Sequence, residues 1–141
     1  MQKGKNSPKT VLIVDDAPYV RKTLKQILVS QGYKIVGEAD SGLEAIRLYE
    51  EVRPDIVTMD LVMPHMNGVD ATRAILLKDP AAKIIILSAM LQENLVTEAI
   101  LAGAKDYIVK PFQTEDVLRI MKTVAVEPEA PRLSSVGGVA S

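Results

Sequence analysis

The chain has no cysteine, one histidine and almost no net charge, and these shortages exclude several kinds of function. Without cysteine, its 141 residues cannot form disulfides, act through a catalytic thiol or bind zinc through sulfur. The formal net charge of −1 offers no basic surface of the kind that attracts nucleic acid. The single histidine, His65, lies in a polar loop segment, where we expect a solvated side chain rather than a catalytic base.

Long apolar runs are also missing. No run approaches the roughly 18 residues that a membrane span needs, and the basic segment at residues 1–10 lacks a following signal-peptide core. A hydrophobic content of 48% with 25% charged residues is typical of a globular domain. We therefore expect a soluble, cytoplasmic protein with one domain at residues 10–125. A flexible segment is expected at 1–9, and a Pro-, Gly- and Ser-containing flexible tail at 126–141.

What the chain does contain is a regular alternation of strand and helix patterns. Short Val- and Ile-rich runs predict strands buried on both faces, and apolar residues spaced by three and four predict the helices between them. The expected strands are Thr10–Asp15, Lys34–Ala39, a run ending at Asp60, a run ending before Ser88, and Asp106–Val109. The expected helices are Ala17–Gln31, one capped by Ser41, Val69–Lys78, Gln92–Ala102 and one capped by Thr114. Such βα units predict a doubly wound α/β fold with five parallel strands and five helices.

Polar side chains follow four of these strands where each strand ends. Asp15 and Asp16 follow the first, Asp60 the third, Ser88 the fourth and Lys110 the fifth. Ligands of open parallel sheets bind beyond the carboxyl ends of the strands, so these residues predict a site at one edge of the sheet.

The residue types indicate phosphoryl chemistry at that edge. Carboxylates that repel one another are tolerated where a cation neutralises them, and oxygen ligands suit Mg²⁺. If the first and third strands are neighbours, Asp15, Asp16 and Asp60 converge on such an ion. Lys110 adds a positive charge and Ser88 a hydroxyl, so Asp60 could attack phosphorus and form an aspartyl phosphate.

Four motifs give the chain a specific resemblance. They are Val11-Leu12-Ile13-Val14-Asp15-Asp16, Met59-Asp60-Leu61-Val62-Met63-Pro64 with Asn67-Gly68, Ser88-Ala89, and Lys110-Pro111-Phe112. Together they resemble the receiver domain of two-component response regulators. The run Ala99 to Tyr107 is similar to the chemotaxis-type (CheY-like) single-domain members. This resemblance, rather than the residue pattern, implies a flavodoxin-like fold with strand order 2-1-3-4-5.

The resemblance also implies a role for each site residue. Asp60 would accept phosphate from the phosphohistidine of a sensor histidine kinase. Asp16 and Asp60 would bind Mg²⁺ through their side chains, Asp15 largely through water, and Val62 through its backbone carbonyl. Lys110 and Ser88 would contact phosphate oxygens, and the orientation of Tyr107 would report activation. The Lys110-Pro111 peptide would be cis. Such a phosphoacceptor catalyses only its own phosphorylation and dephosphorylation, so we do not expect an enzyme acting on other substrates.

Three other classes fit the sequence less well. A flavodoxin-type flavin binder needs a hydroxyl- and glycine-rich loop after the first strand, where this chain has Asp15-Asp16-Ala17-Pro18. A phosphatase with an aspartate nucleophile commonly has a second Asp two residues later, where this chain has Val62. A P-loop hydrolase needs a G-x-x-x-x-G-K-[ST] motif, which does not occur.

The polar tail is too short for a DNA-binding helix-turn-helix unit, so we expect the signal to leave through a protein partner, with no nucleic acid or membrane involved. By resemblance, that partner would bind the surface of the fourth helix, fifth strand and fifth helix, including Lys105 and Tyr107. A flagellar motor switch protein is the leading expectation. A histidine phosphotransfer protein of a phosphorelay is the alternative.

Overall fold

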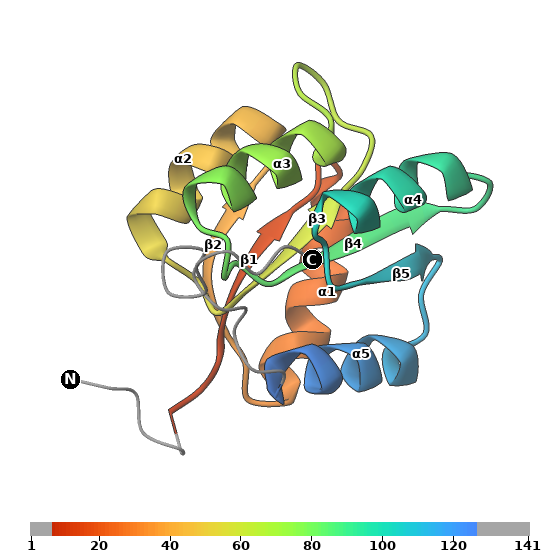
Figure 1. Cartoon of the computed structure of the whole chain (residues 1–141). Helices are drawn as coiled ribbons and strands as arrows, with labels where there is room; N and C mark the ends of the chain where they lie inside the picture. Colours follow the sequence, from red (N-terminus) through yellow and green to blue (C-terminus); the bar gives the residue numbers. More distant parts are fainter. Residues whose placement is uncertain (1–6, 127–141) are drawn as a thin grey trace.

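A computed structural model describes residues 7–126, and these form a five-stranded parallel sheet covered by helices on both faces (Figure 1). The strand order is β2-β1-β3-β4-β5, which confirms the expected flavodoxin-like topology. The strands are β1 (Thr10–Val14), β2 (Lys34–Ala39), β3 (Ile56–Asp60), β4 (Ile84–Ala89) and β5 (Asp106–Lys110). The helices are α1 (Pro18–Ser30), α2 (Gly42–Val52), α3 (Gly68–Lys78), α4 (Glu93–Ala102) and α5 (Thr114–Val126). The flexible ends predicted at 1–9 and 126–141 lie outside the described residues, apart from residues 7–9 and Val126.

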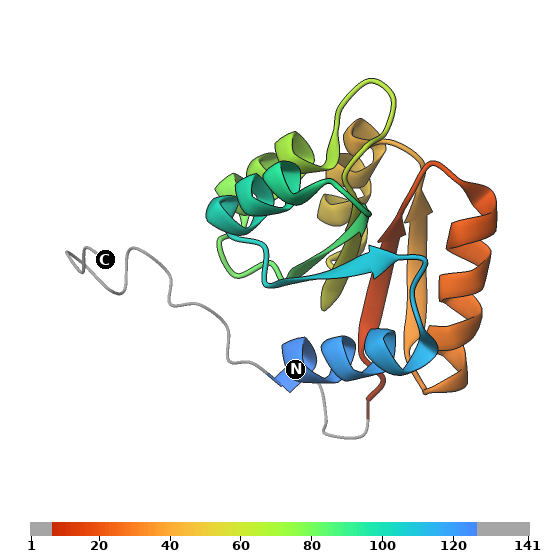
Figure 2. The ribbon, with the colours of Figure 1, turned by 90° about the vertical axis from the view of Figure 1, so that its right-hand side faces the viewer.

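The sheet divides the core into two layers. Side chains of a strand alternate between its faces, so Leu12 and Val14 pack with α2, α3 and α4, whereas Val11 and Ile13 pack with α1 and α5. Figure 2 shows the two groups of helices on opposite sides of the strands. Every residue of β3 is buried, which explains its unbroken apolar run up to Asp60.

The helix ends follow the expected chemistry in most places. Ser41 caps α2 by accepting a hydrogen bond from the Glu44 amide, at 3.2 Å. Asn67 caps α3 in the same way, accepting from the Asp70 amide at 2.9 Å. Thr114, expected to precede the last helix as its cap, is instead the first residue of α5.

Among the helices of the described part, none has both the length and the apolar character that crossing a membrane requires.

Register brings the carboxyl ends of the central strands to one edge of the sheet, which we call the rim. Val14 of β1 pairs with Met59 of β3, so Asp15 and Asp60 follow at the same level. On the other side of β3, Asp60 pairs with Leu87, and Ala89 of β4 pairs with Lys110 of β5. The rim therefore gathers the ends of β1, β3, β4 and β5.

Candidate functional site

Three carboxylates meet at the rim. Oxygen atoms of Asp15, Asp16 and Asp60 lie within 4.8 Å of one another. Asp15 is completely buried and Asp60 is 6% exposed, whereas Asp16 is exposed to solvent. The cluster is thus open on one side, as a site that exchanges ligands with solvent must be.

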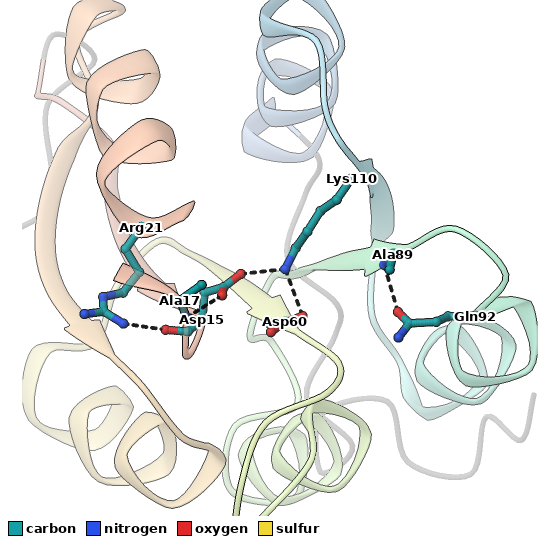
Figure 3. A network of polar contacts seen from close by, with 7 residues as sticks. All are labelled: Asp15, Ala17, Arg21, Asp60, Ala89, Gln92 and Lys110. Carbon is teal, nitrogen blue, oxygen red and sulfur yellow. Dashed lines mark hydrogen bonds and ion pairs between the residues drawn. The ribbon is translucent and has the colours of Figure 1, made fainter. Parts of the chain in front are cut away.

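Lys110 is the cation of this cluster. From the end of β5, its Nζ donates to Asp15 Oδ2 at 2.8 Å and to Asp60 Oδ1 at 3.2 Å (Figure 3). Burial lowers the pKa of Lys110, but the hydrogen bond to Asp15 and the charges of Asp60 and Asp15 outweigh that effect and raise it overall. Lys110 therefore stays an ammonium and bridges two carboxylates.

One ammonium does not compensate three carboxylates. Burial, and then repulsion from Asp15, raises the pKa of Asp60 from 3.8 to about 6, although Lys110 opposes the change. An additional cation beside Asp60 would favour its ionised form. The observed donor set is made of oxygens, open to water on the Asp16 side, and it suits Mg²⁺.

Asp15 is held in place through contacts that the sequence did not predict. Its Oδ1 accepts from the Ala17 amide at 2.9 Å, which ties the carboxylate to the start of α1. The Arg21 guanidinium donates to the Asp15 carbonyl at 2.7 Å and pairs with Glu38 of β2 at 3.1 Å. Arg21 therefore links α1 to the end of β1, as Figure 3 shows, and also to β2 through Glu38. Its position in the first turn of α1, six residues after Asp15, was the available sequence signal.

Gly68 positions the loop after Asp60. Its amide donates to the Leu61 carbonyl at 2.8 Å. A Cβ atom at Gly68 would overlap the backbone carbonyl of Asp60, so only glycine permits this approach of α3 to β3. The Asn67-Gly68 pair thus caps α3 and leaves room for the Asp60 backbone.

Among the described residues, no hydrogen bond joins the other predicted site residues, Ser88, Val62 and Tyr107, to the carboxylate cluster. Ser88 is 2% exposed at the end of β4. Val62, two residues after Asp60, has a side chain that is 54% exposed. Tyr107 is half-exposed on β5 and lines a cleft of about 490 Å³ together with Ser88 and Val96. The Lys110-Pro111 peptide is cis, as the resemblance implied.

The structure shows a second contact at the rim that the sequence did not predict, between Ala89 and Gln92. The Ala89 amide donates to the side-chain oxygen of Gln92 at 2.8 Å, beside the Asp60 cluster in Figure 3. From the sequence, Gln92 only marked the start of a helix.

Comparison with known proteins agrees with this geometry. The family described as "Response regulator receiver domain" matches residues 11–122. The chain belongs to the response regulator receiver family. This confirms the resemblance seen in the sequence motifs.

Its relatives include chemotaxis proteins. The chemotaxis protein CheY of Thermotoga maritima is 55% identical over 117 residues, which cover 83% of this chain and 98% of that protein. CheY of Bacillus subtilis is 50% identical over 115 residues, which cover 81% and 96%. The receiver domain is therefore of the CheY-like type used in two-component signalling, and the similarity supports a role in chemotaxis.

A solved relative has the same fold. The CheX-CheY-BeF3-Mg²⁺ complex of Borrelia burgdorferi gives a TM-score of 0.81 at 39% identity, covering 85% of this chain and 91% of the other. Receiver domains bind Mg²⁺ through an acidic pocket, and Asp15, Asp16 and Asp60 form such a pocket here. A receiver domain of this kind also implies a histidine kinase as partner.

Proposed function

We propose that this receiver domain takes a phosphoryl group from the phosphohistidine of a sensor histidine kinase onto Asp60, in a reaction that depends on Mg²⁺. The observation that carries the proposal is the bridge from Lys110 Nζ to Asp15 and Asp60 within a cluster of three carboxylates. A carboxylate with an adjacent ammonium and a free side facing solvent is arranged to receive a phosphoryl group.

Each residue has a role in this reaction. An oxygen of ionised Asp60 forms the new P–O bond as the P–N bond breaks, and the electron pair of that bond stays on the imidazole nitrogen, which takes up a proton. Lys110 neutralises one phosphoryl oxygen, and the Ser88 hydroxyl donates to another. Asp15, Asp16, Asp60 and the Val62 carbonyl would hold Mg²⁺. The ion, when bound, offsets the negative charge of the phosphoryl oxygens.

The same site would remove its own phosphate by hydrolysis and act on no other substrate, so we propose a signalling phosphoacceptor rather than an enzyme. Val62 stands where phosphatases with an aspartate nucleophile place their second Asp, which supports this assignment.

Phosphorylation would control a protein-binding face formed by α4, β5 and α5. This face includes the cleft that Tyr107 lines, and exposed apolar side chains such as Leu101, 82% exposed, also line it. The similarity to chemotaxis proteins favours a flagellar motor switch protein as the partner. A histidine phosphotransfer protein of a phosphorelay is the second candidate.

Incubation with acetyl phosphate and Mg²⁺ tests the chemistry. We expect one phosphoryl group per chain by intact mass spectrometry, and none with Asp60→Asn, which keeps the shape but removes the attacking charge. Asp70→Asn, at an exposed carboxylate of α3, is the matched control and should label like wild type. Undiminished labelling of the Asp60 variant would overturn the proposal, and repeated turnover of foreign phosphate esters would favour a phosphatase.

The output is tested by binding. Phosphorylated and unphosphorylated protein should be titrated with a fragment of a motor switch protein and, separately, with a histidine phosphotransfer protein. Tighter binding of the switch fragment after phosphorylation supports the motility role. Transfer of the phosphate to the phosphotransfer protein would support the relay instead.

A further inference from the structure

Gln92 contacts the rim from the turn that joins β4 to α4. Its backbone carbonyl accepts the first hydrogen bond of α4, from the Val96 amide at 3.0 Å. Its side chain points the other way and accepts from the Ala89 amide at 2.8 Å. Between these two residues the chain turns through Leu91, whose φ of 69° is left-handed. The side chain thus reaches back over the turn to the last residue of β4.

The Ala89 amide belongs to the row of β4 backbone groups that face β3, the strand that ends at Asp60. Along β4, the carbonyls of Lys83 and Leu87 accept hydrogen bonds from Val57 and Leu61, at 2.9 and 3.3 Å. Alternate residues of a strand direct their amide and carbonyl groups to the same neighbour. The N–H of Ala89, two residues after Leu87, therefore faces the β3 side of β4.

The hydrogen bonds between β3 and β4 end before the Ala89 amide, because the next carbonyl on the β3 side already accepts another hydrogen bond. One more rung would pair the Ala89 amide with the Leu61 carbonyl, but that carbonyl accepts from Gly68 at 2.8 Å. Gln92 supplies the acceptor instead. Since Ala89 is exposed, this is a neutral hydrogen bond at the surface, which a charged acceptor could replace.

Gln92 also belongs to the cleft at the proposed output face. It lines the cleft together with Ala89, Val96 and Tyr107. A change in the Gln92 side chain would therefore alter both the donor beside Asp60 and the wall of the cleft.

We propose that Gln92 is a positioning residue that caps the Ala89 amide in the unphosphorylated protein and is displaced from it by a phosphoryl oxygen on Asp60. A hydrogen bond to a charged phosphoryl oxygen is roughly twice as strong as one to a neutral amide oxygen, so the exchange favours the phosphorylated state. The released side chain then changes the cleft between α4 and β5. The proposal rests on the proposed function, because it needs a phosphoryl group at Asp60.

The exchange can be measured with beryllofluoride and Mg²⁺, a stable mimic of the phosphoryl group. Gln92→Met keeps a side chain of similar length but has no amide oxygen, and Gln92→Ala removes the side chain beyond Cβ. Both variants lack the hydrogen bond from the Ala89 amide to the Gln92 side chain. Because the proposed exchange breaks that bond anyway, its loss affects only the protein without beryllofluoride. We expect both to bind beryllofluoride roughly three- to tenfold more tightly than wild type, the factor that corresponds to one net hydrogen bond. Gln26→Met and Gln26→Ala, at an exposed position of α1, are the matched controls and should bind like wild type.

Amide NMR spectra give a second readout that a general change in stability would not produce. Without beryllofluoride, the Ala89 amide resonance of Gln92→Met should differ from that of wild type. With saturating beryllofluoride the two resonances should coincide, because the same acceptor then occupies the amide.

The outcomes separate the two proposals. Unchanged or weaker binding in both Gln92 variants would overturn the cap, as would an Ala89 resonance that still differs in the saturated state. Failure of wild type itself to bind beryllofluoride with Mg²⁺ would overturn the proposed function and the cap with it.

Discussion

Carboxylates lie at both edges of the sheet, but their neighbours differ. At the edge opposite the rim, Asp55 accepts from the Thr10 amide at 2.7 Å and from its hydroxyl at 3.1 Å. Asp79 accepts from the Tyr49 hydroxyl at 2.7 Å and from Arg53 at 3.2 Å. Asp55 thus takes donors from the start of β1, and Asp79 takes donors from α2 and the residue that follows it.

At the rim, by contrast, Asp15 and Asp60 share the one Lys110 ammonium. Burial, and then repulsion from Asp15, raises the pKa of Asp60, so the ionised Asp60 carboxylate opposes folding there. The carboxylates at the opposite edge accept hydrogen bonds from Thr10, Tyr49 and Arg53, whereas those at the rim crowd within 4.8 Å of one another. The difference predicts that mutations at the two edges act on different properties.

The largest effect is expected where the rim is most tightly packed. Gly68→Ala places a methyl group against the Asp60 carbonyl and should lower the free energy of unfolding by about 3 kcal/mol. Gly32→Ala, at the end of α1 toward the opposite edge, has open space and only an unfavourable φ of 91°, so about 1 kcal/mol is expected. Urea unfolding of both variants checks this. Equal losses would show that Gly68 does not position Asp60 by close packing.

Removing the rim charge should stabilise the metal-free protein. Because the folded-state pKa of Asp60 is raised from 3.8 to about 6, the folded state binds more protons than the unfolded state between these values. The contribution of Asp60 to stability is therefore lost as the pH rises from about 4 to about 6. In chelator above pH 6, Asp60→Asn should be more stable than wild type by about 2 kcal/mol. The two should converge near pH 4, and a less stable Asn variant at pH 7 would contradict this sign.

At the opposite edge, loss of a carboxylate should have the reverse effect. Asp55→Ala removes the acceptor from the Thr10 amide and hydroxyl, so we expect the free energy of unfolding to fall by about 1–2 kcal/mol. Labelling by acetyl phosphate should be unaffected under conditions where the variant is folded. If a folded Asp55→Ala protein fails to label, carboxylates at the opposite edge also affect phosphorylation, and the predicted difference between the two edges is wrong.

Magnesium should act on the rim alone. Millimolar Mg²⁺ that exceeds its dissociation constant about tenfold adds about 1.4 kcal/mol through binding to the folded state. We expect a higher melting temperature in Mg²⁺ than in chelator for wild type and for Asp55→Ala. Asp16→Lys, which places an ammonium near the ion's position, should remove the response. Identical melting of wild type in both buffers would refute the metal site.

The smallest effect concerns the lifetime of the phosphate. By analogy with other receivers, we expect Val62 and Met90 to flank the path of the attacking water. Both side chains are apolar and exposed, at 54% and 67%. Neither can orient water, so we expect slow self-dephosphorylation. The Val62→Asn, Met90→Glu double variant should lose phosphate several-fold faster, equivalent to about 1 kcal/mol in the barrier. The loss of phosphate after removal of acetyl phosphate measures this rate. Equal rates for wild type and the double variant would show that Ser88, Lys110 and the metal set the rate without Val62 and Met90.

Much of the fold could be predicted from the sequence because it depends on local patterns. The buried runs before Asp60 and Ser88 are strands, and the capping residue Ser41 begins α2 as expected. Helix boundaries differ from the predictions by about one residue, as at Thr114, since the first turn of a helix can include its expected cap. The order of the strands needed the family resemblance, because any order satisfies the same local patterns.

The sequence by itself determined which residues could meet at the rim, since parallel strands deliver their carboxyl ends to one edge and Asp15, Asp16, Asp60, Ser88 and Lys110 each lie at or just beyond the carboxyl end of a strand. Only the tertiary structure decided how they are held. The sharing of Lys110 between Asp15 and Asp60, and the link that Arg21 makes from the Asp15 carbonyl to Glu38, depend on distances between separate elements. No periodicity or spacing along the chain encodes those distances, because they are set by how the helices pack on the sheet.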